Sequence, residues 1–151
     1  TAVWCCRAVL PYMIEQGSGS IVNIATHAVT GRFRVPYAAA KAGQIGLTTS
    51  LAKEVAHLGI RVNCAAPSGT IAEDRVTPRN YGIDILASAL PPEEREAQEK
   101  YRGEQRLVET PMGRRGEAVE QAAAIAFLAS HDASYITGQV LPVGGGQPYP
   151  F

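Results

Sequence analysis

No stretch of this sequence is long and apolar enough to cross a membrane. A membrane-spanning helix needs about 18 or more consecutive apolar residues, and polar or charged residues interrupt every apolar run before that length. The opening segment, TAVWCCRAVL, also lacks the basic region, apolar core and small-residue cleavage site of a secretory signal peptide. The sequence therefore predicts neither a membrane protein nor a signal-bearing one.

The sequence also has no net charge and no cysteine pattern that indicates disulfides or a metal site. Fourteen Lys and Arg residues balance 14 Asp and Glu residues, so nothing indicates the positive surface that nucleic acids or membranes attract. The three cysteines, two of them adjacent, form neither a disulfide framework nor a zinc-binding pattern. We therefore expect a cytoplasmic protein with reduced, buried thiols, and no metal, nucleic-acid or membrane partner.

The sequence does have enough apolar residues, 46% of the chain, to build the core of one domain. Three short runs, Ile21–Ala25, Ile60–Ala66 and about Val140–Val143, have the length and β-branched content of buried strands. Their near-continuous apolar character is typical of a parallel sheet covered on both faces. The sequence therefore predicts an α/β fold with parallel strands between two helical layers.

Helical patterns alternate with these strands. A glycine ends two of the expected helices, at Gly17 and Gly59. The last helix is expected to bury its apolar side against the sheet. The expected helices are Thr1–Gln16, Tyr37–Leu58, Pro92–Arg106 and Glu117–Ser130, and the apolar side of the last comprises Val119, Ala122, Ala123, Ala126 and Phe127.

The stretch Ser20–Lys41 holds a candidate catalytic group. Thr26 follows the first strand, at the end where open α/β sheets bind their ligands. Tyr37 and Lys41 are four residues apart, so they share one face of the expected helix. A free tyrosine phenol titrates near pH 10, and a nearby ammonium favours the phenolate. Tyr37 could then accept a proton from an alcohol whose oxygen Thr26 holds. The alternative is a packed tyrosine, a solvated lysine and a purely structural threonine.

Here the motif resembles the short-chain dehydrogenase/reductase family, whose hallmark is Tyr-x-x-x-Lys after a strand that ends in Ser. The strings RAVLPYM, GIRVNCAAPSGT and ASYITGQVLPVGGG match the family in the same order, and the resemblance covers nearly the whole chain. It implies a Rossmann-like doubly wound sheet and an NAD(P)-dependent oxidoreductase. The implied catalytic residues are Tyr37, Lys41 and Thr26, and the implied cofactor-binding residues are Tyr37, Lys41, Pro67, Ser68, Gly69 and Thr70.

The chain departs from the family at several points. Thr26 stands where most relatives have Ser, and Ser68 stands where they have Gly. Relatives are longer and begin with a strand and a glycine-rich dinucleotide turn, whereas the only glycine cluster here is Gly144–Gly146. We therefore expect residues 1–151 to be the carboxyl-terminal portion of one dinucleotide-binding domain that alone does not bind NAD tightly. The choice between NAD and NADP stays open, with NAD expected.

Local strings are similar to one subgroup, the dehydrogenases for cis-dihydrodiols of aromatic carboxylates. They include VWCCRAVLPYM, the run Arg75–Asn80 and the 11-residue offset from Thr26 to Tyr37. The subgroup implies a substrate carboxylate, for which Arg34, Arg75 and Arg79 are candidate ligands because guanidinium groups bind carboxylates bidentately. Each arginine could equally be a solvated surface charge.

Other features are implied or left open. The insertion of residues 71–112 is expected to close over the substrate, and His27 is either pocket lining or surface. The family's helical dimer contact implies a homo-oligomer, a dimer or tetramer. Two further functions remain open: a general reductase, for example of 3-oxoacyl thioesters with NADPH, and a non-catalytic, oligomerising module.

Overall fold

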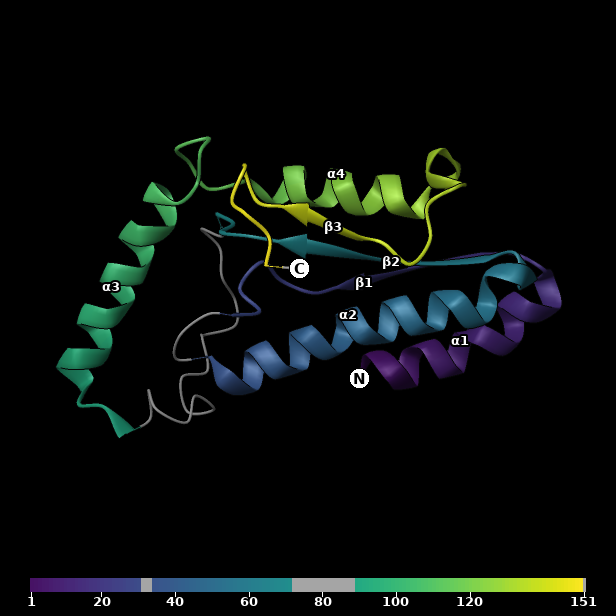
Figure 1. The fold of residues 1–151 in the computed structure, drawn as a ribbon, viewed down its shortest axis with the longest axis horizontal. Coiled ribbons are helices and arrows are strands. Elements are labelled where there is room, and N and C mark those ends of the chain that lie inside the picture. The colour runs from purple at the N-terminus through teal and green to yellow at the C-terminus, as the bar shows by residue number, and fades with distance from the viewer. Residues whose placement is uncertain (31–33, 72–88, 151) are drawn as a thin grey trace.

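The chain folds into a three-stranded sheet with helices on both faces, as the computed structural model in Figure 1 shows. The structure describes residues 1–30, 34–71 and 89–150. Short 3₁₀ turns follow α2, at Ala56–Leu58, and α4, at His131–Ala133. The main elements are α1 (Ala2–Gln16), β1 (Gly19–Ile24), α2 (Val35–Val55), β2 (Ile60–Pro67), α3 (Pro92–Val108), α4 (Ala118–Ala129) and β3 (Val140–Val143).

The sheet has the order β1-β2-β3, and both strand pairs are parallel. Asn23 of β1 pairs with Cys64 of β2, which in turn pairs with Val140 of β3. Val62 and Cys64 of the central strand are completely inaccessible to solvent. The predicted parallel α/β architecture is confirmed, although β1 begins two residues before the expected Ile21.

Two helices cover one face of the sheet and one helix covers the other (Figure 1). On the first face, α1 and α2 pack a core against β2. That core comprises Cys6, Leu51, Ala52, Val55, Ile60 and Val62. Among the residues that the structure describes, no helix is both long and apolar enough to cross a membrane.

Glycines at the ends of α1 and α2 bring both strand starts to one edge. Gly17 (φ 67°) ends α1 by donating to the carbonyls of Ile14 and Met13, and Gly59 (φ 76°) ends the turn after α2. Because β1 and β2 start together and run parallel, their carboxyl ends share the opposite edge. That edge holds the candidate site, and α3 lies beyond it (Figure 1).

The face that α4 buries differs from the expected one. The five apolar residues expected in the core, from Val119 to Phe127, are exposed, and Gln121 and Leu128 are buried instead. The helix is apolar on nearly every side, so its periodicity does not select a face. Hydrogen bonds do: the Leu128 carbonyl accepts from Arg61 (2.9 Å) and from Ser20 (3.2 Å), which fixes the rotation of α4 over the sheet.

Candidate active site

Thr26 lies two residues beyond the end of β1 and is only 7% exposed. Its hydroxyl oxygen accepts a hydrogen bond from the Ala28 amide at 3.2 Å, which closes a tight local turn. The same hydroxyl points toward the Pro67 carbonyl at the end of β2, at a long 3.5 Å. A substrate oxygen could therefore compete for this proton at little cost.

The ammonium of Lys41 reaches the same end of β1 from α2. Its Nζ donates to the carbonyl of Ile24, the last residue of the strand, at 2.6 Å. An ammonium carries three donor hydrogens, so two remain for other acceptors. Lys41 is therefore a fixed cation beside Thr26 and not a solvated surface lysine.

Tyr37 lies one turn before Lys41, near the start of α2. Its side chain is 41% exposed, so a substrate can reach it. The Arg34 guanidinium carbon lies 5.7 Å from the centre of the Tyr37 ring, which is a cation–π distance. If Arg34 binds a substrate carboxylate, as the sequence predicts, that carboxylate lies next to Tyr37, the candidate base.

The loop after β2 is fastened on both sides. The Pro67 carbonyl accepts from the His27 amide at 2.9 Å, and the Ser68 amide donates to the Val143 carbonyl at 3.1 Å. The Gly69 carbonyl accepts from the Gly116 amide at 3.0 Å. The Thr70 hydroxyl donates back to the Ser68 carbonyl at 3.2 Å. The predicted cofactor loop is thus rigidly placed at the carboxyl end of β2.

A cleft opens beside this loop, on the α4 side of the sheet edge. Ser68 and Gly69 line it, whereas Thr26, Tyr37 and Lys41 do not. The site residues predicted from sequence thus form two neighbouring groups, one at the end of β1 and one at the end of β2. Arg75 and Arg79 lie outside the described residues. The rest of the cleft lining comprises Thr110, Met112, Arg114, Arg115, Gly116, Glu120, Gln121, Val143, Gly144 and Gly145.

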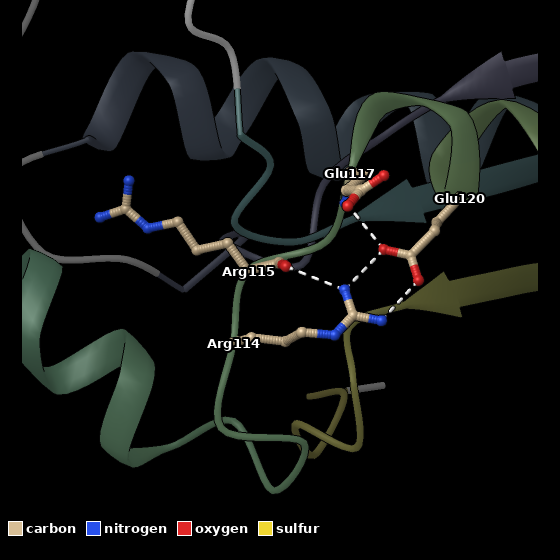
Figure 2. Close-up of polar contacts among 4 residues, drawn as sticks. All are labelled: Arg114, Arg115, Glu117 and Glu120. Carbon is tan, nitrogen blue, oxygen red and sulfur yellow. Dashed lines mark hydrogen bonds and ion pairs between the residues drawn. The ribbon is translucent and has the colours of Figure 1, made fainter.

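One wall of the cleft is held by an ion pair that the sequence analysis missed (Figure 2). The Arg114 guanidinium binds both oxygens of Glu120, at 2.6 and 2.8 Å, and the Glu117 amide donates to the same carboxylate at 2.8 Å. These bonds lower the pKa of Glu120 to about 2. Glu117 and Glu120 form a capping box at the start of α4. Their three-residue spacing in the sequence could have predicted this helix start. The Arg115 side chain points away from the pair.

His27 is half-buried, and its contacts come from the far end of the chain. Its Nε2 lies 3.1 Å from the Gln147 carbonyl, and its ring meets the Tyr149 ring edge-on at 5.2 Å between centres. Burial lowers the pKa of His27. No local pattern reveals contacts across about 120 residues, so the sequence alone does not distinguish pocket lining from surface for His27.

Known proteins are similar to this chain in sequence and in fold over most of its length. A family model described as "Enoyl-(Acyl carrier protein) reductase", of the short-chain alcohol dehydrogenase type, matches residues 1–147. The chain belongs to the short-chain dehydrogenase/reductase family. Its parallel sheet agrees with that of a candidate NAD(P)-dependent gluconate 5-dehydrogenase of this family from Beutenbergia cavernae, solved with NADP bound. The TM-score is 0.70 at 33% identity, over 94% of this chain and 51% of that one.

Curated short-chain dehydrogenases give closer sequence matches. The 1,6-dihydroxycyclohexa-2,4-diene-1-carboxylate dehydrogenase of Acinetobacter baylyi is 48% identical over 96% of this chain and 53% of its own length. A 3-oxoacyl-[acyl-carrier-protein] reductase from Thermotoga maritima is 43% identical over 93% of this chain and 50% of its own length. The chain thus spans about half the length of the curated relatives it matches.

Proposed function

We propose that this chain supplies the catalytic portion of an NAD-dependent dehydrogenase for a cis-dihydrodiol of an aromatic carboxylate. The observation that carries the proposal is the 2.6 Å hydrogen bond from Lys41 to the Ile24 carbonyl. It holds a cation at the end of β1, one helical turn from Tyr37, where a positive charge favours the phenolate that would accept a proton from an alcohol. The similarity to the Acinetobacter enzyme supports the choice of substrate.

The residues present fit the nicotinamide half of NAD. Lys41 keeps two donor hydrogens beyond the one on Ile24, enough for the two hydroxyls of a ribose. Pro67, Ser68, Gly69 and Thr70 form a fixed loop whose backbone borders a cleft, and they would hold the nicotinamide. When bound, the nicotinamide ring accepts a hydride, which is chemistry that no side chain supplies.

In this proposal Tyr37 accepts the alcohol proton. The Lys41 ammonium stabilises the phenolate, because an opposite charge nearby favours the ionised form. Thr26 donates its weakly held hydroxyl proton to the substrate oxygen and so orients it. Arg34, over the Tyr37 ring, attracts the substrate carboxylate. Arg75 and Arg79 stay predictions for the same role.

Oxidation of the secondary alcohol next to the carboxylated carbon gives a β-keto acid. The C–H electron pair leaves as hydride and the O–H proton goes to Tyr37, so the carbon becomes a carbonyl. Loss of carbon dioxide then leaves an electron pair in the ring that takes up one proton, and the product is an aromatic catechol. The reaction therefore releases no net proton, and the protein need only bind, orient and remove one proton at Tyr37.

The second candidate is a 3-oxoacyl thioester reductase that uses NADPH. The Thermotoga relative, at 43% identity, favours it. The two functions differ in the direction of hydride transfer and in the charge of the substrate near Tyr37. A thioester offers no carboxylate to Arg34, whereas the diol acid does.

The test is steady-state oxidation by the longest natural form of the protein that contains this chain. We expect kcat/KM for the benzoate cis-diol with NAD to exceed that for the uncharged benzene cis-diol at least about a hundredfold, because one partner of a buried charged pair is otherwise left unpaired. Each molecule of the benzoate cis-diol that is oxidised should yield one NADH, one catechol and one carbon dioxide. Equal rates for both diols would contradict the carboxylate preference, and preferred reduction of a 3-oxoacyl thioester by NADPH would establish the alternative.

We also propose a cytoplasmic, homo-oligomeric protein. All three cysteines, Cys5, Cys6 and Cys64, are free thiols, and the last two are buried, which suits a reducing compartment. The exposed side of α2 carries small residues, Ala39, Gly43 and Gly46, that allow a second helix to approach closely.

A further inference from the structure

The residues after β3 turn back across the carboxyl ends of the strands toward β1 (Figure 1). We call Gly144–Tyr149 the tail segment. The His27 ring nitrogen Nε2 meets the Gln147 carbonyl at 3.1 Å, and the Ser68 hydroxyl donates to the Gln147 side-chain carbonyl. The Gly145 carbonyl also accepts from the Met112 amide at 3.1 Å. The Tyr149 ring packs edge-on against the His27 ring.

The anchors at His27 and Ser68 belong to the two halves of the candidate site. His27 directly follows Thr26 at the end of β1, and Ser68 directly follows Pro67 at the end of β2. Gln147 therefore bridges the loop that would orient the substrate oxygen and the loop that would hold the nicotinamide. A segment in this place borders the space in which both would meet.

Gly144 shows how closely the tail segment is fitted to His27. A Cβ atom at this position would lie 2.7 Å from His27 Cδ2 and 2.9 Å from Nε2. Both distances are too short for real contacts, so the chain passes directly against the imidazole only because residue 144 has no side chain. Since the Gln147 carbonyl only accepts, His27 must carry its proton on Nε2 to make the bond.

Given the proposed function, we infer that the tail segment is a wall of the substrate site, and that His27 is the positioning residue that holds this wall in place. The wall limits the size of the ring that can sit against Thr26 and Tyr37. His27 acts through Gln147 and Tyr149 and takes no part in proton transfer.

The test compares three variants of the longest natural form of the protein: His27→Ala, a deletion of residues 147–151, and both changes together. Loss of one hydrogen bond and a ring contact should raise KM for the benzoate cis-diol about tenfold and leave kcat within about twofold. The double variant should be no worse than the deletion alone, because the deletion already removes both partners of His27, Gln147 and Tyr149. The kcat/KM of a para-isopropyl benzoate cis-diol relative to the unsubstituted one should rise about tenfold in all three.

Two matched variants separate positioning from general damage. His27→Gln retains an N–H donor and should recover most of the loss, because only the ring contact with Tyr149 is then missing. His57→Ala removes an exposed histidine in the turn after α2 and should change nothing. A fall in kcat at constant KM, a double variant clearly worse than the deletion alone, or unchanged ring-size selectivity would each overturn the inference.

Failure of the proposed function would look different, since the parent protein would not oxidise the diol. Hydrogen exchange at the backbone amides of residues 144–147 and 149 then measures directly how firmly the tail segment is held. Exchange should be faster in His27→Ala than in His27→Gln or His57→Ala. Equal exchange rates in the three variants would overturn the role of His27 without bearing on the substrate.

Discussion

At the scale of single residues, the site depends on one lysine whose ammonium donates a hydrogen bond to a backbone carbonyl at the end of β1. A lysine on an exposed helix would normally be solvated, but Lys41 donates to the Ile24 carbonyl at 2.6 Å and so contributes a fixed charge. Tyr37, one turn away, is accessible enough to meet a substrate. The roles proposed for these two side chains make distinct kinetic predictions.

Tyr37→Phe removes the proton acceptor and little else. We expect kcat to fall about a hundredfold or more, because general-base catalysis typically contributes at least that factor. The measurement is steady-state oxidation of the benzoate cis-diol, with thermal unfolding to check that the fold is intact. Thr26→Ser, which keeps the hydroxyl, serves as the matched control and should retain most activity. Retention of more than about a tenth of kcat by Tyr37→Phe would exclude this tyrosine as the base.

At the scale of elements, two glycines end helices with nearly the same backbone angle but different surroundings. A Cβ atom at Gly17 (φ 67°) would have no neighbour within 4 Å, whereas one at Gly59 (φ 76°) would collide with the Gly17 carbonyl oxygen. Gly17→Ala should therefore destabilise by about 1–2 kcal/mol, the cost of the left-handed conformation. Gly59→Ala should cost clearly more. Urea unfolding of both variants measures the difference, and equal losses would show that the chain relaxes around the collision.

The ion pair at the start of α4 makes a pH-dependent prediction. The folded pKa of Glu120, about 2, lies below its usual 4.5, so the carboxylate stabilises the fold above pH 4.5 and this contribution is lost as pH falls toward 2. Glu120→Gln should therefore lower the melting temperature at neutral pH by a small, salt-sensitive amount, because the pair is exposed. The difference from the parent should shrink between pH 4.5 and 2. Glu54→Gln, on α2, is the control, and a constant difference across this range would contradict the assignment.

At the scale of the whole molecule, the exposed face of α2 bears on the proposed oligomer. A Cβ at Gly43 or Gly46 would have no neighbour within 4 Å, so nothing in the described part of the chain covers these positions. Gly43→Arg should therefore leave the monomer folded but shift the equilibrium from oligomer to monomer, because the large cation prevents a second helix from packing closely. Sedimentation at several concentrations measures this shift, with Glu104→Arg on α3 as the control. An unchanged mass distribution would place the interface elsewhere.

Much of the fold was already determined by the sequence. Val62 and Cys64 lie in a run of strand length that is apolar apart from Arg61 and Asn63, and such a run favoured a buried parallel strand. Gly17 and Gly59 were readable as helix ends because left-handed backbone angles exclude most other residues. The four-residue spacing of Tyr37 and Lys41 put both on one helix face, since that periodicity is local.

Only the tertiary structure decided what depends on contacts between distant segments. The face that α4 buries was chosen by Arg61 and Ser20, because a helix that is apolar all round carries no preference of its own. Lys41 became a fixed charge only when α2 packed beside the end of β1, and His27 acquired its partner only when the chain after β3 crossed the sheet edge. These hydrogen bonds join residues that are far apart in the sequence. No local sequence periodicity predicts them, so they are known only from the folded structure.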